Sequence, residues 1–260
     1  MTKPLFYQTH KAGTDRPWLV LLHGLFGNLD NLAVVRRHFE DRFNILSVDL
    51  PDHGQSFHLS HFTLQSCVES LIETLDLLSV GEASLLGHSL GGKVAMLSAL
   101  IHPERVKQLI VADIAPVTYA PKHQNIFRGL RNVDLANLTR RQEADAEMAE
   151  YISEPGVRQF LLKSLYQDDN KIWHWRFNVE GLINNYDEIR QWPSLEKTFV
   201  KPTLFIKGGN SSYLDSRYRE DVARIFPAAK ARVIEDAGHW LHAEKPAEFN
   251  KLVEAELTRC

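Results

Sequence analysis

The chain has 260 residues, of which 44% are hydrophobic and 24% are charged, and its formal net charge is -3 at pH 7. This length suits one large domain or one domain with an insertion, and the near-neutral charge excludes the basic excess of nucleic-acid-binding proteins. No apolar run approaches the about 18 residues that cross a membrane, and the first residues lack the apolar core of a signal peptide. We therefore expect a cytoplasmic protein with neither a membrane nor a nucleic-acid partner.

Short β-branched and leucine-rich runs recur along the chain, and they predict buried parallel strands. These runs span residues 18–24, 44–50, 83–89, 106–114, 202–209 and 231–236. Helical patterns alternate with them, at residues 31–40, 63–78, 91–104, 216–226 and 246–257. This alternation predicts an α/β fold with a doubly wound, mostly parallel sheet flanked by helices.

The alternation stops between residues 116 and 198, where we find only helical signals. A capping box of Thr139 and Gln142, a start at Pro155 and an N-cap at Asn178 each predict a helix there. We expect residues 116–198 to form a helical cap. Residues 1–115 and 199–260 would then form one discontinuous core domain.

The stretch Gly87-His88-Ser89-Leu90-Gly91 fits the pattern Gly-x-Ser-x-Gly, at the end of a predicted strand and the start of a predicted helix. The glycines of such a turn let the backbone approach closely, while the strained turn lifts the serine hydroxyl out of the sheet. The following helix N-terminus favours developing negative charge. This context predicts that Ser89 is a nucleophile.

An earlier strand ends in the sequence HGLFGN, which starts at His23. Acyl transfer needs two N–H donors for the oxyanion of the tetrahedral intermediate, each worth about 3 kcal/mol of barrier. The backbone N–H groups of Leu25 and Leu90 are the natural pair. We therefore predict an oxyanion hole at Leu25 and Leu90.

A serine nucleophile needs a general base, and His239 lies where the fold would deliver one, between the last strand and the last helix. His242 follows where a helix begins, so we interpret it as a cap-facing or structural residue. His23 lies in a strand-end turn, where we expect a structural hydrogen-bonding role, and we interpret His53 as part of the scaffold of a later loop. His239 is therefore the predicted partner of Ser89.

The loop after residues 202–209 is the usual place for the acid that orients the base, but it carries Ser211 and Ser212. A hydroxyl cannot offset the imidazolium charge as a carboxylate does. Asp113 ends the preceding strand, and neighbouring strands lie only about 4.8 Å apart. Asp215 is the competitor, although it is better placed to interact with a helix N-terminus. Asp113 is the predicted acid.

These residues follow the segments HGLFG, VDLPDHGQS and GHSLGG, and over its full length the chain resembles the α/β-hydrolase superfamily. Within that superfamily, the segments HGLFGNLDNL, ADIAPVTY, FLLKSL, WRFNV, GGNSSY and GHWLHAEKP are similar to the small bacterial YbfF-type esterases. The resemblance implies a relay of Ser89, His239 and Asp113 with Ser211 as an auxiliary partner of the histidine. It also implies hydrolysis of small-molecule acyl esters and acyl thioesters, including acyl-CoA.

The aromatic side chains of the predicted cap either line a tunnel for an acyl chain or pack against the core; they are Trp173, Trp175, Phe177, Tyr186 and Trp192. We expect substrate contacts first from Trp173 and Trp175. Three basic residues near the cap entrance either meet CoA phosphates or are solvated surface charges; they are Lys122, Arg128 and Arg131. Cys67 and Cys260 lie too far apart to indicate a disulfide framework or metal cluster, so we expect no metal or cofactor.

Two other kinds of function compete with a serine esterase. A C–C hydrolase or lyase of the menaquinone-pathway kind shares the serine turn and the histidine, but it usually keeps its acid in the later loop, where this chain has Ser211. A non-catalytic ligand-binding protein can also be built on this fold. A complete set of nucleophile, oxyanion donors and base disfavours that second alternative.

Overall fold

The computed structural model describes residues 3–258, which contain a seven-stranded sheet in the order β1-β3-β2-β4-β5-β8-β9. The strands are β1 (Tyr7–His10), β2 (Trp18–Leu22), β3 (Asn44–Val48), β4 (Ala83–His88), β5 (Val106–Ala112), β8 (Thr203–Gly208) and β9 (Ala229–Ile234). Six of them pair in parallel, and the unpredicted β1 pairs antiparallel to β3 at one edge. The mostly parallel α/β sheet predicted from the alternating pattern is confirmed.

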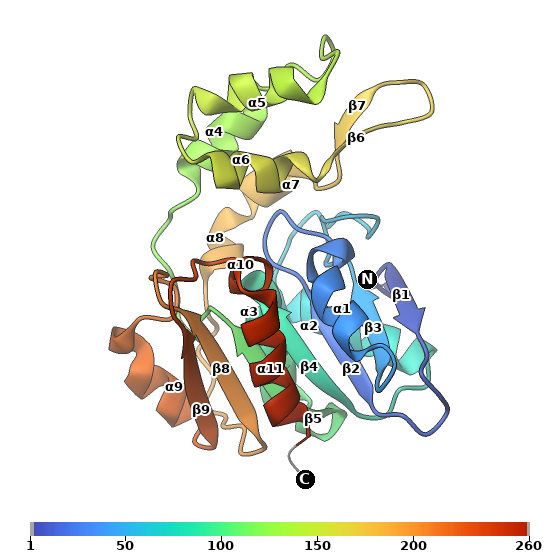
Figure 1. The fold of residues 1–260 in the computed structure, drawn as a ribbon, viewed down its shortest axis with the longest axis vertical. Coiled ribbons are helices and arrows are strands. Elements are labelled where there is room, and N and C mark those ends of the chain that lie inside the picture. Colours follow the sequence, from blue (N-terminus) through green and yellow to red (C-terminus); the bar gives the residue numbers. More distant parts are fainter. Residues whose placement is uncertain (1–2, 259–260) are drawn as a thin grey trace.

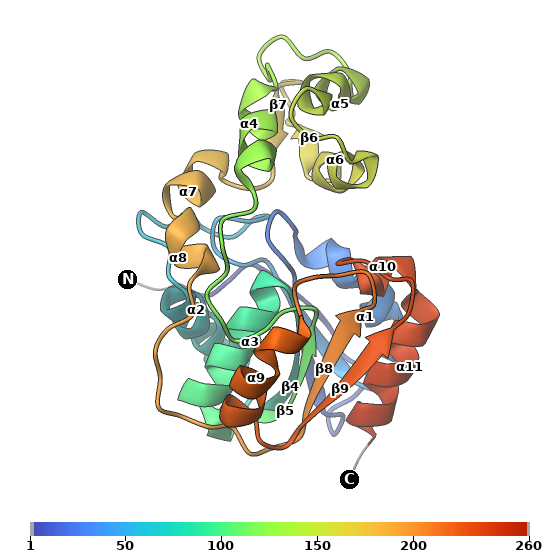
Figure 2. The same ribbon diagram turned by 90° about the vertical axis from the view of Figure 1, so that its left-hand side faces the viewer.

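Helices cover both faces of this sheet (Figures 1 and 2). α1 (Ala33–Phe39) and α11 (Pro246–Leu257) pack on one face, and α2 (Leu64–Leu77), α3 (Leu90–Ile101) and α9 (Arg219–Ile225) pack on the other. Short elements complete the core: η1 (Leu29–Leu32), η2 (Pro103–Arg105), η3 (Ser216–Tyr218) and α10 (Leu241–Glu244). Two-sided cover buries the central strands completely, which explains their continuous apolar runs.

The parallel registers place the carboxyl ends of the central strands at one edge. Gly87 of β4 pairs with Val111 of β5, and Ala112 of β5 pairs with Ile206 of β8. The residues that come after these strands therefore lie together at the same edge, where open α/β sheets bind their ligands.

The chain between β5 and β8 forms a helical insertion over that edge (Figure 1). Its elements are α4 (Gln124–Asn132), α5 (Arg141–Ala149), α6 (Pro155–Leu162), β6 (Leu165–Gln167), β7 (Trp173–Trp175), α7 (Val179–Asn184) and α8 (Tyr186–Arg190). The predicted helix starts at Pro155 and Asn178 are confirmed, and the Asn178 side chain accepts the N–H of Gly181. The helical signals along this segment therefore located most of the insertion correctly.

Two expectations for the insertion are wrong. It is not purely helical, because β6 and β7 form an antiparallel pair in which Leu165 lies opposite Trp175. The capping box is also displaced, since the Thr139 hydroxyl and N–H both donate to Glu143, one residue beyond the predicted Gln142. A strand of three residues is too short to show an alternating pattern.

Two further features belong to the described part of the chain. Along residues 3–258, every helix is too short or too polar to cross a bilayer. Cys67 of α2 is a buried free cysteine, whereas Cys260 lies outside the described residues.

Candidate active site

Ser89 occupies a strained turn between β4 and α3. Its backbone has φ 51° and ψ -117°, and its N–H donates to the carbonyl of Ala112 on the neighbouring strand at 3.0 Å. A side chain on Gly91 would overlap the backbone of Leu22 and His23, so only glycine fits at the first turn of α3. A non-glycine residue at positive φ costs roughly 1–3 kcal/mol, which the packed strand and helix hold in place. This is the turn that the Gly-x-Ser-x-Gly pattern predicts.

The predicted oxyanion donors flank Ser89. Leu90 is the first residue of α3, so its N–H lacks an acceptor within the helix. Leu25 lies in the turn after β2, and no acceptor in residues 3–258 takes up its N–H. Both residues line a cavity together with Ser89. Two unused N–H groups beside the serine form an arrangement that can receive an oxyanion.

Two buried histidines hold the turn that carries Leu25. The N–H of Phe26, at φ 63°, donates to His53 Nε2 at 3.1 Å, and the N–H of Leu50 donates to His23 Nε2 at 3.0 Å. Burial lowers the pKa of His53 to about 3 and that of His23 to about 4, so both rings stay neutral and can accept these bonds. The interpretation of His23 and His53 as structural residues is confirmed.

Asp113 and His239 are joined by a hydrogen bond although they lie 126 residues apart in the chain. The Nδ1–H of His239 donates to Asp113 Oδ2 at 2.7 Å, and the N–H of Gly208 donates to Asp113 Oδ1 at 3.1 Å. The Asp113 side chain is fully buried, and a buried carboxylate requires such donors. This bond uses Nδ1, which leaves Nε2 of His239 for another partner.

Ser211 lies beside Asp113. Its hydroxyl donates to Asp113 Oδ2, and its Oγ accepts the N–H of Tyr213 at 3.2 Å. The auxiliary role implied for Ser211 beside the histidine stays a prediction, and in the structure its hydroxyl donates to the charged carboxylate of Asp113. Its influence on His239 therefore passes through Asp113.

Aromatic rings surround the imidazole of His239. Tyr213 stacks on it with ring centroids 4.0 Å apart, and the Nε2–H of His88 donates to the backbone carbonyl of His239 at 2.8 Å. His242 is buried against His88, and burial lowers its pKa to about 3, so its predicted structural role is confirmed. We did not predict the contacts of His88 and Tyr213, since His88 occupies the variable position of the serine motif.

Asp215, the competing candidate for the acid, does not join this cluster. Its side chain accepts the N–H of Arg217 at 3.0 Å as the N-cap of η3. Hydrogen bonds and the charge of Arg217 lower the pKa of Asp215. The expectation that Asp215 interacts with a helix N-terminus is confirmed.

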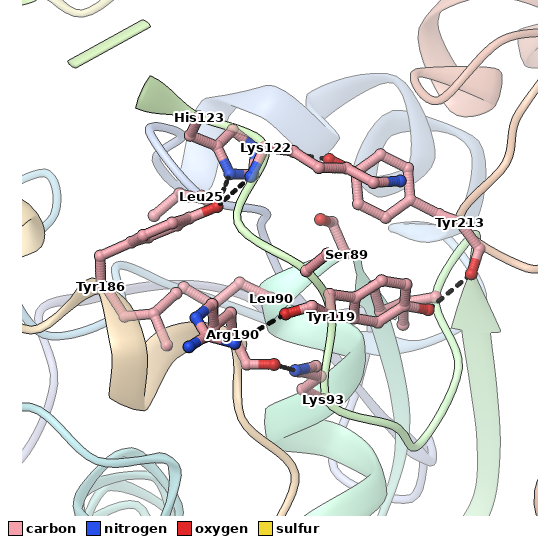
Figure 3. A pocket seen from close by; sticks show the side chains of 13 residues that line it. Leu25, Ser89, Leu90, Lys93, Tyr119, Lys122, His123, Tyr186, Arg190 and Tyr213 are labelled. Atoms are coloured by element: carbon pink, nitrogen blue, oxygen red, sulfur yellow. Dashed lines mark hydrogen bonds between the residues drawn. The ribbon is translucent and has the colours of Figure 1, made fainter. Parts of the chain in front are cut away.

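Two cavities meet at Ser89, and both are also lined by Leu25, Lys122, His123 and Tyr213. The smaller cavity, shown in Figure 3, has a volume of about 40 Å³. The larger has a volume of about 230 Å³, and His239 contributes to its wall. Ser89 thus opens onto two spaces of different size.

The predicted substrate contacts of Trp173 and Trp175 are not found in either cavity. Trp173 is buried within the insertion, and Trp175 stacks on Phe177 with ring centroids 5.5 Å apart. Burial of their large apolar surface inside the insertion explains this placement. Tyr186 is the cap aromatic, among the five named from the sequence, that lines the smaller cavity.

The basic residues of the insertion divide into two kinds. Lys122 lines both cavities, and its ammonium lies 4.7 Å from the ring centroid of Tyr213. Arg131 forms an exposed ion pair with Glu180, and Arg128 is exposed. Of the three basic residues named from the sequence, Lys122 is therefore the one that can meet a ligand beside Ser89.

Residues 17–246 match the family model described as the alpha/beta hydrolase fold. The chain therefore belongs to the α/β-hydrolase family. Its homologues in this family include esterases and lipases, which are hydrolases of carboxylic esters. The predicted superfamily and enzyme class are confirmed.

Individual relatives cover nearly the whole chain. Esterase YbfF of Escherichia coli K12 is 41% identical over 240 residues, which are 92% of each chain. The sn-1-specific diacylglycerol lipase ABHD11 of Danio rerio is 35% identical over 94% of this chain and 80% of its own length. A solved structure of a marine microorganism esterase has a TM-score of 0.93 at 32% identity and covers 98% of this chain. The similarity to YbfF-type esterases is thus confirmed over both the core and the insertion.

Proposed function

We propose that the protein is a serine esterase in which Ser89 is the nucleophile, His239 the general base and Asp113 the acid that orients His239. The observation that carries this proposal is the 2.7 Å bond between His239 Nδ1 and Asp113 Oδ2 next to the strained Ser89 turn. Ser89 and His239 line the same cavity, which supports proton transfer between them.

Acylation begins when Ser89 Oγ attacks the ester carbonyl carbon and His239 Nε2 takes the hydroxyl proton. The carbonyl oxygen becomes an oxyanion that accepts the N–H groups of Leu25 and Leu90. The bond between the carbonyl carbon and the leaving oxygen then breaks, and His239 returns its proton to that oxygen. The products of this half-reaction are a free alcohol and an acyl-Ser89 ester.

Deacylation repeats these steps with water. A water molecule gives one proton to His239 and adds to the acyl carbon, and the same two N–H groups hold the second oxyanion. The bond to Ser89 Oγ breaks, and the proton on His239 restores the serine hydroxyl. Asp113 stays ionised throughout and stabilises the imidazolium that forms in each half-reaction.

Small-molecule acyl esters are the proposed substrates, together with acyl thioesters such as acyl-CoA. The esterase and lipase names of the full-length relatives support the ester class. A thiolate is a good leaving group, so the same groups can serve a thioester. We further propose that residues 116–198 act as the cap that selects the substrate, since this segment supplies much of the wall of the larger cavity, including Ile126, Val157, Phe160 and Leu161.

The alternative functions receive less support. Ser211 stands in the loop where the C–C hydrolases and lyases usually carry their acid, and it bonds Asp113 rather than replacing it. A non-catalytic binding protein would not require a strained serine, two unused N–H donors and an oriented histidine at one place. The esterase is the function that uses all of these features.

The test is a burst assay with p-nitrophenyl acetate and butyrate. The native protein should release a burst of p-nitrophenol that matches the enzyme concentration, and a fluorophosphonate should label Ser89. Ser89→Ala should abolish the burst and the label and reduce kcat by about 10⁶-fold. A native protein that shows neither a burst nor labelling is not a serine esterase.

A further inference from the structure

The two cavities at Ser89 differ in which reacting groups they contain. The smaller one is lined by Leu25 and Leu90, the proposed oxyanion donors, but His239 does not line it. The larger one is lined by His239 and by Leu25. An ester bound at Ser89 therefore meets His239 on one side only.

A bridge of hydrogen bonds stands where the two cavities adjoin. The ring of His123, in the insertion, bonds the hydroxyl of Tyr186 through Nδ1 at 2.5 Å and the hydroxyl of Tyr213 through Nε2 at 3.3 Å. Burial lowers the pKa of His123 to about 4, so its neutral ring can both donate and accept. Figure 3 shows His123, Tyr186 and Tyr213 around Ser89. Because His123 and Tyr213 line both cavities, they form part of the wall between them.

The chemistry of ester cleavage assigns one substrate half to each cavity. The leaving oxygen must receive its proton from His239, so the alcohol half has to extend along the wall that contains His239. The carbonyl oxygen must lie at the N–H groups of Leu25 and Leu90. The remaining direction for the acyl chain is the smaller cavity.

The sizes and linings of the cavities then define the substrate. On the same measure, the smaller cavity of about 40 Å³ offers far less room than the larger one of about 230 Å³. The larger cavity of about 230 Å³ has a mostly apolar wall that includes Val157, Phe160, Leu161 and Trp240. We infer that the enzyme selects esters with a short acyl group and a bulky apolar alcohol. This inference rests on the proposed function and adds the identity of each substrate half.

The far wall of the smaller cavity supports a short acyl group. Ile189 is buried there, and Lys93 is fixed beneath it because its ammonium donates to the carbonyls of Arg190 and Gln191 at 2.6 and 2.8 Å. These two bonds tie α3 to the C-terminal end of α8. This attachment holds the wall at α8 against α3.

The decisive experiment compares two isomers of identical composition, hexyl acetate and ethyl hexanoate. Acid release is followed in a pH-stat, and each kcat/KM is divided by the hydroxide-catalysed rate of the same ester. We expect the normalised value for hexyl acetate to exceed that for ethyl hexanoate by at least about tenfold. Equal values, or a preference for ethyl hexanoate, would overturn the assignment of the cavities.

Substitutions in the wall of each cavity test whether that cavity causes the preference for hexyl acetate over ethyl hexanoate. Ile189→Ala should enlarge the smaller cavity and lower the isomer ratio at least about fivefold, and Ile189→Val should do so to a smaller extent if the alanine variant folds poorly. Phe160→Ala should reduce kcat/KM for hexyl acetate but not for ethyl acetate. Ile172→Ala is the control, because Ile172 is an exposed apolar residue of the insertion that lines neither cavity, and it should leave the ratio unchanged. An unchanged ratio in folded Ile189→Ala and Ile189→Val proteins would contradict the inference.

The outcomes separate this inference from the proposed function. If neither isomer is hydrolysed and a fluorophosphonate does not label Ser89, the esterase proposal fails and the inference fails with it. If both isomers are hydrolysed without the expected preference, the esterase proposal survives and only the assignment of the cavities is lost.

Discussion

The carboxyl edge of the sheet and the helical insertion above it are built in different ways. At the sheet edge, buried polar groups bond across long stretches of chain, as Asp113 does to His239 and Phe26 does to His53. In the insertion, many polar contacts are local and exposed, such as those between Thr139 and Glu143. The edge thus holds its side chains rigidly, while the insertion depends mainly on apolar packing.

From this difference we infer which region determines the rate of the proposed esterase and which determines its choice of substrate. The proposed reacting groups all lie just beyond strands whose positions the sheet register determines. Much of the wall of both cavities comes from the insertion, with Tyr186 and Ile189 in the smaller cavity, Phe160 in the larger one and His123 in both. Changes at the edge should alter the rate for every ester, whereas changes to the residues of the insertion that line the cavities should alter the choice among esters.

After the loss of the nucleophile itself, the largest expected effect comes from the acid at the sheet edge. Asp113→Asn should reduce kcat by about 10⁴-fold, because the amide cannot stabilise the imidazolium and favours the wrong tautomer of His239. Asp215→Asn is the matched control, since Asp215 caps η3, and it should retain native kcat. Steady-state kinetics with p-nitrophenyl acetate measures both. A large loss in Asp215→Asn together with native activity in Asp113→Asn would refute the assignment.

Substitution of a packing residue of the insertion should reduce the stability of the protein and leave its substrate preference unchanged. Trp173→Ala should lower the free energy of unfolding by about 3–5 kcal/mol, because a buried ring is removed and a cavity remains. Urea unfolding followed by circular dichroism measures this loss. Since Trp173 lines neither cavity at Ser89, the ratio of the two ester isomers should stay native. A changed ratio at native stability would show that Trp173 contacts substrate after all.

The buried histidines of the sheet edge predict that the free energy of unfolding decreases at acidic pH. Burial lowers the pKa of His23 to about 4 and the pKa values of His53 and His242 to about 3, whereas an unfolded histidine titrates near 6.5. Between these values the unfolded chain binds more protons than the folded one, so stability falls as the pH drops below about 6.5. Each such histidine contributes up to about 1.4 kcal/mol per pH unit.

Urea unfolding at pH 7 and pH 5 tests this prediction. His242→Phe should reduce the loss of stability between the two pH values, because His242 is buried and its Nδ1 has no hydrogen-bond partner among residues 3–258. Ile172→Phe is the control from the insertion, because it introduces the same ring at an exposed position without removing a titratable group, and it should leave the pH dependence unchanged. Equal pH dependence in native and His242→Phe proteins would contradict the account.

The smallest expected effect belongs to Ser211. Ser211→Ala removes one of the donors to Asp113, but it leaves the donors Gly208 and His239 in place. We expect kcat to fall by about tenfold, which corresponds to the about 1.4 kcal/mol that a hydrogen bond to a charged group is worth at the low end. A loss as large as that of Asp113→Asn would mean that Ser211 takes part in the relay directly.

The sequence predicted the structure best at the central sheet, where residue patterns follow directly from strand burial and turn geometry. The buried strands and the turn at Ser89 were predictable because burial on both faces and a strained serine turn each restrict residue type locally. The position of Asp113 beside His239 was predictable from strand adjacency. The hydrogen-bond partner of the Ser211 hydroxyl was not predictable. Whether that hydroxyl bonds the carboxylate of Asp113 or the imidazole of His239 depends on small differences in distance that a sequence does not encode.

The insertion was less predictable for the same physical reason. β6 and β7 have three residues each, which is less than two periods of a strand pattern, and their pairing is decided by tertiary packing. An aromatic residue such as Trp175 carries the same sequence signal whether it contacts a ligand or another ring. The structure is needed to tell these two situations apart.

The insertion enters the chain after Asp113 and before His239. Residues up to Asp113 therefore already contain the proposed nucleophile, both oxyanion donors and the acid, and they lie on paired strands whose register is independent of the length of the insertion. Evolution can lengthen, shorten or exchange the segment between β5 and β8 and still return the chain to the same register at Ile206. If the insertion selects the substrate as we propose, the position of this junction lets substrate preference change while the proposed catalytic residues are inherited unchanged.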